Sequence, residues 1–209
     1  MHIALYGATG KSGGRILTEA ISRGHQVTAI MRDTAKLSPR VGLTVVKGDV
    51  SSASEIASKI KGADAVVSAY APPADDTDQL LPVTQNLVDG VKEAGVGRLI
   101  IVGGAGSLEV APGVTLISSG HLPDAWMPIA VSHAKVLEQI KTSDINWTYF
   151  SPAAFFEPGV RTGKFRLGGD QLVTGENHES RISLEDYAIA LVDELETPQF
   201  ERKRFTIGY

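Results

Sequence analysis

The sequence contains no cysteine, and this absence excludes thiol catalysis, disulfide bonds and thiolate metal sites. No apolar run reaches the ~18 residues of a membrane-spanning helix, and no basic leader segment follows Met1. Basic blocks are also absent, and the net charge of −4 makes nucleic acid and anionic membranes poor partners. We therefore expect a cytoplasmic protein with no nucleic-acid partner, no membrane partner and no metal site.

What is present suits one α/β domain over residues 1–209, with a small C-terminal lobe for substrate: the chain is 43% hydrophobic and 21% charged. Unbroken apolar runs predict buried parallel strands, and helical patterns fall between them. The strands are expected at 2–6, 26–31, 43–47, 64–69, 98–103 and 146–150, and the helices at 12–23, 54–60, 78–94 and 131–142. This order predicts a Rossmann-like, doubly wound parallel sheet flanked by helices, with its ligand crevice beyond the carboxyl ends of the strands.

The tail carries one further helix and one further strand. In "RISLEDYAIALVDELE", Ser183 and Asp186 resemble a capping box, and Leu184, Tyr187 and Leu191 belong to one apolar stripe. The segment "RFTIGY" predicts a closing strand.

The stretch "IALYGATGKSGGRIL" contains the fragment "GKS", which also ends the P-loop pattern. A P-loop needs a second glycine five positions before Gly10, and Leu5 stands there instead. Gly7, Gly10 and Gly13 fit the dinucleotide-binding turn between a strand and a helix. In that turn the first glycine allows the tight exit, the second lets backbone approach a pyrophosphate, and the third lets the helix pack closely on the sheet.

The residues at two strand ends bear on which dinucleotide binds. Arg32 ends the second strand, where an arginine can pair with the 2′-phosphate of NADP and an acidic residue would bind the ribose of NAD. Arg32 could instead be a solvated partner of Asp33, and Asp33 could bind a ribose, so both NADP(H) and NAD(H) stay open. Asp49 and Val50 follow the third strand, where an adenine would lie, although Asp49 could equally be a turn residue or helix cap.

The proton-donating pair of ordinary short-chain dehydrogenases, a tyrosine with a lysine four residues later, does not occur at any of the five tyrosines. On the helix that would carry the pair, Val131 stands four residues before Lys135. Alcohol dehydrogenase chemistry is therefore not expected.

These motifs give the chain its resemblance to the atypical short-chain dehydrogenases. It is similar in particular to the small bacterial NAD(P)H-flavin reductase family, which resembles biliverdin/flavin reductase and, more distantly, NmrA-like proteins. The resemblance spans the chain through "GATGxxG", "GGAGSL", "HAKVLE" and the tail motif. It implies a pyrophosphate site at Gly7, Thr9, Gly10, Lys11, Ser12 and Gly13, a 2′-phosphate site at Arg32, and an adenine site at Asp49 and Val50. It further implies a nicotinamide site at Ala69, Gly103, Ser107, Pro152 and Ala153.

The activity that this resemblance implies is hydride transfer from NAD(P)H, NADPH being preferred, to a flavin or similar conjugated acceptor such as a quinone or tetrapyrrole. Flavin would be a substrate and not a tightly bound cofactor. Such acceptors spread the arriving charge over their rings, so no dedicated acid is compulsory. Ser107, His133 and Lys135 are the candidate polar catalytic residues, although His133 could simply pack on its helix and Lys135 could face water. Residues 104–130 and 152–182 are expected to supply the acceptor-site loops, with Trp126 and Met127 over the acceptor's rings.

Two other function classes stay open. One is a redox sensor of the NmrA type that binds the dinucleotide without turnover, and the other is a nucleotide-sugar epimerase or dehydratase. The partner is expected to be a small-molecule acceptor, and the protein a monomer or a homodimer.

Overall fold

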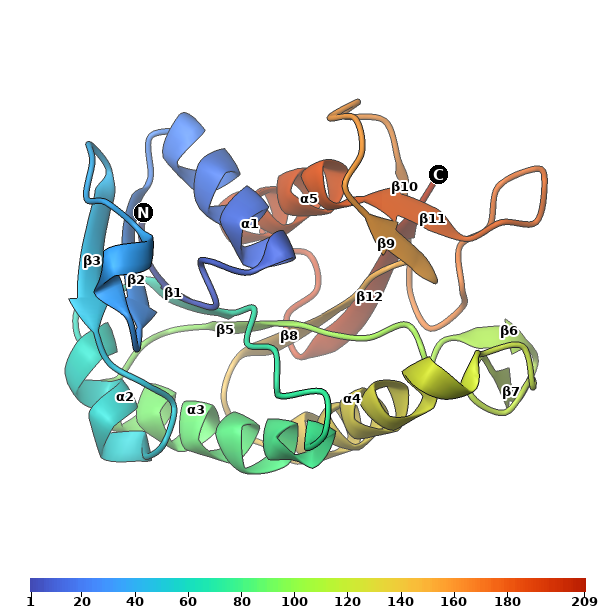
Figure 1. The fold of residues 1–209 in the computed structure, drawn as a ribbon, viewed down its shortest axis with the longest axis horizontal. Helices are drawn as coiled ribbons and strands as arrows, with labels where there is room; N and C mark the ends of the chain where they lie inside the picture. The colour runs from blue at the N-terminus through green and yellow to red at the C-terminus, as the bar shows by residue number, and fades with distance from the viewer.

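Eight strands form one central sheet in the computed structural model, which describes residues 1–209 (Figure 1). Every neighbouring pair of strands is parallel except the pair at the β10 edge. In spatial order the strands are β10 (Arg166–Gly168), β12 (Lys203–Gly208), β8 (Trp147–Ser151), β5 (Leu99–Val102), β4 (Ala65–Ser68), β1 (His2–Tyr6), β2 (Gln26–Met31) and β3 (Leu43–Lys47).

Helices cover both faces of this sheet (Figure 1). α1 (Lys11–Ser22) and α5 (Leu184–Glu196) pack together on one face. α2 (Ala53–Ile60), α3 (Leu80–Ala94) and α4 (Met127–Lys141) form the other layer. The predicted Rossmann-like, doubly wound sheet is therefore confirmed.

The remaining elements are short. They are the single-turn helices η1 (Thr34–Lys36), η2 (Thr77–Gln79) and η3 (Asp124–Trp126), and the strand pairs β6 (Glu109–Ala111) with β7 (Val114–Thr115) and β9 (Phe155–Glu157) with β11 (Arg181–Ser183). None of the helices combines the length and apolarity that crossing a membrane would require.

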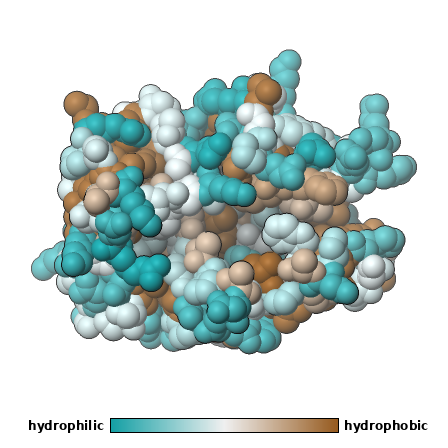
Figure 2. Space-filling view, viewed as in Figure 1, coloured by the Kyte–Doolittle hydropathy of each residue, from teal (hydrophilic) through white to brown (hydrophobic).

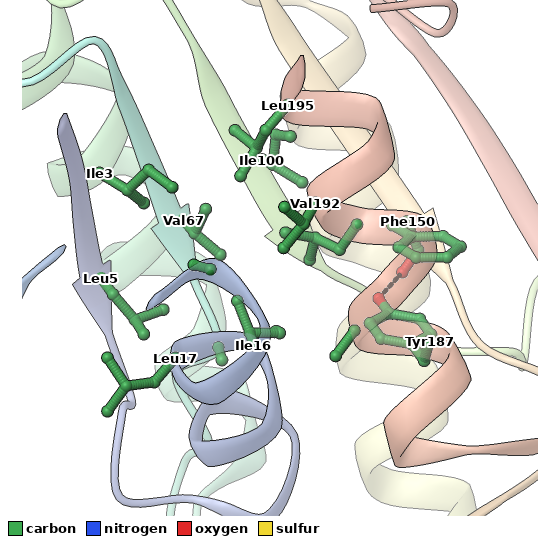
Figure 3. Close-up of a cluster of buried hydrophobic side chains, with 14 of the residues drawn as sticks. Ile3, Leu5, Ile16, Leu17, Val67, Ile100, Phe150, Tyr187, Val192 and Leu195 are labelled. Atoms are coloured by element: carbon green, nitrogen blue, oxygen red, sulfur yellow. Dashed lines mark hydrogen bonds between the residues drawn. The ribbon is translucent and has the colours of Figure 1, made fainter. Parts of the chain in front are cut away.

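Successive residues of β1 face opposite layers, as the pleat of a strand dictates. Ile3 and Leu5 join the core beneath α1 and α5, whereas Ala4 and Tyr6 join the core above α2, α3 and α4. Figure 3 shows the first of these cores, where Tyr187 of α5 donates a hydrogen bond to the carbonyl of Phe150 (2.7 Å). The strand ends that surround the crevice are thus fixed by packing on both sides.

The structure extends and corrects the predicted elements in two places. α4 begins at Met127, earlier than the predicted start at 131, and Pro128 occupies its first turn, where a missing N–H costs nothing. β10, β6, β7, β9 and β11 were not predicted, because two or three residues are too few to show a periodic pattern. Only half of the expected capping box is present: the Ser183 hydroxyl accepts a hydrogen bond from Asp186 N (3.0 Å), whereas Ser183 N donates to Tyr209 Oη (3.3 Å).

Candidate functional site

The turn between β1 and α1 can be built only with glycine. Gly7 has φ +81°, and a Cβ on it would lie 2.2 Å from the carbonyl oxygen of Ala69. A Cβ on Gly13 would lie 2.0 Å from the carbonyl oxygen of Gly7. Backbone from β1, β4 and α1 therefore meets at this point, and the helix starts directly at the strand ends.

The N-terminus of α1 is left without a cap. Its N-cap residue is Gly10, no side chain accepts from the first N–H groups, and no acidic residue lies in the first turn. Free N–H groups and the positive end of the helix dipole together attract an anion. The predicted pyrophosphate site has the geometry that an anion requires.

A cleft of about 470 Å³ opens beside this helix end; we call it the glycine-loop half. Seven predicted cofactor residues line it: Gly7, Thr9, Gly10, Arg32, Asp49, Val50 and Ala69. They come from the ends of β1, β2, β3 and β4, which the fold brings to one edge of the sheet.

Two cations of the glycine-loop half have no partner in the protein. Arg32 is exposed and forms no hydrogen bond or ion pair, and Lys36 of η1 lies on the same wall. The neighbouring carboxylates are both engaged by backbone: Asp33 accepts from Ala35 N (3.1 Å) and Asp49 accepts from Ser51 N (2.8 Å). The hydrogen bonds from Ser51 hold the pKa of Asp49 below its usual range. Positive charge is thus available here for an anion.

A second cleft of about 390 Å³, which we call the Trp126 half, continues from the first and shares its Ala69–Ala71 wall. In Figure 2 the middle of the molecule's face is hollowed, with apolar and weakly polar residues inside a hydrophilic rim. No Asp, Glu, Lys or Arg lines the Trp126 half. Besides the shared wall, its lining residues are Ser12, Pro72, Ala74, Thr77, Val102, Gly103, Ala125, Trp126, Pro128, Ile129, His133 and Phe156.

His133 is the one imidazole in this lining, and its protonation state follows from its contacts. Tyr149 Oη donates to the carbonyl oxygen of His133 (2.9 Å) and accepts from Gly104 N (3.2 Å). His133 Nδ1 lies 3.3 Å from the same hydroxyl, whose proton is already used, so we assign the proton to Nδ1 and a lone pair to Nε2. Burial lowers the pKa of His133 to about 4. The ring is therefore neutral near pH 7 and offers a hydrogen-bond acceptor.

The other two catalytic candidates lie outside both halves of the cleft. The Ser107 hydroxyl accepts a hydrogen bond from Arg204 Nη1 (2.9 Å). Lys135 is exposed and forms an ion pair with Asp78 (3.0 Å). The structure therefore brings only His133, of the three, to the lining of the cleft.

Some predicted cofactor residues also lie away from the lining. Lys11 is exposed at the first position of α1, Gly13 is buried against Gly7, and Pro152 and Ala153 are buried in the turn after β8.

The lining residues that the sequence did not single out include Lys36, Tyr70 and Phe156, the last of which lies within the expected acceptor loop 152–182. Tyr70 directly follows a predicted strand end, which was a usable signal. Lys36 and Phe156 reach the cleft through a single-turn helix and a three-residue strand, which have no sequence signature. The chain has no group of three or more His, Asp or Glu side chains placed to hold a metal ion.

Comparison with known proteins agrees with this geometry. A family model described as NAD(P)H-binding matches residues 7–198. YwnB of Bacillus subtilis, an uncharacterized protein, is 39% identical over 99% of this chain and 98% of its own length. The crystal structure of a candidate epimerase from Bacteroides thetaiotaomicron is 45% identical, covers 100% of this chain and 96% of its own, and superimposes with a TM-score of 0.93. A candidate NADH-flavin reductase from Streptococcus pneumoniae is 33% identical over 100% of this chain and 99% of its own, with a TM-score of 0.90.

Proposed function

Because the chain belongs to the NAD(P)H-binding family, we propose that it is an NAD(P)H-dependent reductase that passes a hydride to a flavin or a similar conjugated acceptor. The observation that carries this proposal is the continuity of the cleft. An anion-attracting half built on the glycine turn meets an uncharged, largely apolar half along the Ala69–Ala71 wall. A dinucleotide that spans the two halves would present its nicotinamide to whatever occupies the Trp126 half. The name of the Streptococcus pneumoniae relative points the same way.

The residues of the glycine-loop half fit a dinucleotide phosphate. The uncapped start of α1 suits the pyrophosphate, since its first N–H groups are free and Gly7 allows the tight turn that brings them to the strand ends. Arg32 and Lys36 are free to pair with a 2′-phosphate, and the Asp33 carboxylate already caps η1. These two cations support a preference for NADPH over NADH.

When bound, the reduced nicotinamide supplies the hydride, and the protein's own task is to bind, orient and exclude water. Gly103 contributes backbone to the lining of the Trp126 half, and only glycine fits there because a Cβ would lie 2.2 Å from the ring of Tyr149. His133 is neutral near pH 7, and burial holds its pKa at about 4, so solvent and not this imidazole completes protonation of the acceptor. Flavin is accordingly a substrate in this scheme.

The test is the oxidation of NADPH and of NADH with FMN, FAD, riboflavin or a small quinone as acceptor. Arg32→Ala should raise the dissociation constant of NADPH about 10- to 100-fold and leave that of NADH unchanged, the usual effect of losing charge-assisted hydrogen bonds to a phosphate. Arg40→Ala, which removes the same charge from an exposed position outside the cleft, is the matched control. If Arg32→Ala weakened the binding of NADPH and of NADH equally, the assignment of Arg32 to the 2′-phosphate would be contradicted.

Tight binding of NADPH without reduction of any acceptor would favour the sensor function instead. The name of the Bacteroides thetaiotaomicron relative raises a second candidate, epimerase chemistry. Two features count against it: Val131 stands where that chemistry's tyrosine would be expected, and Lys135 is paired with Asp78 outside the cleft. A cytoplasmic location and a monomeric or homodimeric state stay predictions.

A further inference from the structure

We propose that the Trp126 half selects flat, uncharged ring systems: Trp126 stacks on the ring, His133 Nε2 accepts a hydrogen bond from a ring N–H or O–H, and no charged side chain is there to recognise an anionic substituent. This inference rests on the proposed reductase function and narrows its acceptor. Among flavins it favours the isoalloxazine ring itself, with the phosphate of FMN left in solvent. It disfavours acceptors whose carboxylates or phosphates would have to enter the cleft.

The absence of charge in the Trp126 half is the first support. Its only ionisable side chains are Tyr70 and His133. The Tyr70 hydroxyl donates to Gln79 Oε1 (3.2 Å), and Asp78 and Lys135 neutralise each other outside the lining. A phosphate or carboxylate that entered would lose its hydration without gaining a cation, which is costly. Arg32 and Lys36 line the adjoining glycine-loop half, so the lack of cations is confined to the Trp126 half of the cleft.

The exposed indole of Trp126 is the second support. The residue belongs to the lining and keeps 63% of its surface exposed, although a large aromatic ring normally finds a partner. The ring is carried by η3, which is bracketed by Pro123 and Pro128 and so has little backbone freedom. Phe156 also lines this half. An unpartnered aromatic residue on a restricted backbone, in a lining that holds a second aromatic residue, suits a planar conjugated ligand.

The third support is the hydrogen-bonding direction of His133. Nδ1 is fixed on Tyr149 Oη (3.3 Å), and Nε2 has no partner in the protein. A neutral imidazole held in this way offers one lone pair to the cleft and no proton. Ring systems with an N–H or O–H, such as the isoalloxazine ring, satisfy it, whereas a carboxylate or phosphate would face it lone pair to lone pair.

The redox step balances without a further reactant. The acceptor gains a hydride from NADPH, which leaves as NADP⁺, and one proton from solvent. No charged intermediate requires a lysine or arginine in the Trp126 half.

The first experiment compares riboflavin, FMN and biliverdin as acceptors at saturating NADPH, between about 20 and 500 mM salt, a range that spans strong and weak screening. We expect kcat/KM for riboflavin to equal or exceed that for FMN, KM for FMN to be insensitive to salt, and biliverdin, with its two carboxylates, to be the poorest acceptor. Any of three results would overturn the inference: a kcat/KM for FMN more than threefold above that for riboflavin, a KM for FMN that rises with salt, or biliverdin as the best acceptor.

The second experiment reads the site without turnover. Riboflavin should quench the fluorescence of Trp126 saturably, and Trp126→Ala should raise KM for riboflavin about 5- to 30-fold with KM for NADPH unchanged, as for other losses of aromatic stacking. Phe155→Ala removes an exposed aromatic ring outside the lining and should behave as wild type. Unchanged riboflavin kinetics in Trp126→Ala, or no saturable quenching, would overturn the inference. If quenching were saturable but no acceptor were reduced, the proposed binding site would be supported and the reductase function would be contradicted.

Discussion

Replacing Gly13 with alanine tests the glycine turn directly, because the neighbouring Gly14 provides a control in the same helix. The new methyl group of Gly13→Ala would lie 2.0 Å from the carbonyl oxygen and 2.7 Å from the carbonyl carbon of Gly7. Gly7 has little room to move, since the backbone of Ala69, directly after β4, lies close against it. In Gly14→Ala the methyl group would meet only the carbonyl oxygen of Ala8, at 3.5 Å, which is ordinary contact.

We expect Gly13→Ala to lower the free energy of unfolding and Gly14→Ala to raise it. Overpacking costs about 1–3 kcal/mol, and contact with backbone on a fixed turn belongs at the upper end of that range. Alanine recovers roughly 0.5–1 kcal/mol over glycine within a helix. The net expectation for Gly13→Ala is a loss of about 2 kcal/mol, or roughly 4–8 °C in Tm for a chain of this size. For Gly14→Ala the same scale gives a gain of up to about 1 kcal/mol, or roughly 2–4 °C.

Thermal unfolding with and without NADPH measures both effects. Gly13→Ala should also lose much of the stabilisation by NADPH, because the methyl group pushes the start of α1 away from the strand ends. Gly14→Ala should keep it. If Gly13→Ala melts at or above the temperature of Gly14→Ala, the close approach of α1 to the turn does not limit stability, and the geometric argument for the site fails.

Two further predictions concern buried ionisable groups. Burial lowers the pKa of His133 from its ordinary 6.5 to about 4, so the unfolded chain binds the extra proton between these values and the free energy of unfolding should fall as pH drops from about 6.5 to 4. His133→Gln should show a smaller fall in urea midpoint between pH 7 and 4.5, and an equal fall would contradict the assignment. Arg98→Met leaves the buried carboxylate of Glu194 without its ion-pair partner and should cost about 3–5 kcal/mol in urea unfolding. The double variant Arg98→Met/Glu194→Met should recover part of that loss, and no recovery would mean that the backbone contacts of Glu194 matter more than the pair.

Most of the sheet could be predicted from sequence because buried parallel strands leave unbroken apolar runs. The runs at 2–6, 26–31 and 43–47 coincide with β1, β2 and β3. β10 could not be found in this way: it has three residues, lies at the sheet edge and exposes much of its surface, so hydropathy carries no signal. The early start of α4 was missed because a proline normally argues against a helix, whereas here it occupies the first turn.

The same distinction between local patterns and distant contacts applies to the residues of the site. The glycine turn and Arg32 follow from local spacing, so the sequence alone indicates them. The partners of Ser107 and Lys135 are Arg204 and Asp78, which lie far away in the sequence, and no local pattern reveals such contacts. Phe156 lies within residues 152–182, which were expected to supply an acceptor-site loop, but its place on a three-residue strand could not be predicted.

The place of β12 has a consequence for how the protein is made. This strand lies between β8 and β10, yet it is synthesised after both of them, and after α5. While a ribosome is still translating residues 203–208, β8 has an open edge with unpaired N–H and C=O groups. Phe150 of β8 also lacks the ring of Phe205, which stacks on it in the folded protein (3.9 Å). The nascent chain therefore has every part of the glycine turn before it has a closed sheet. Chaperones that recognise open strand edges would bind this protein until β12 has paired, and a chain stopped short of β12 would stay open to them and to proteases.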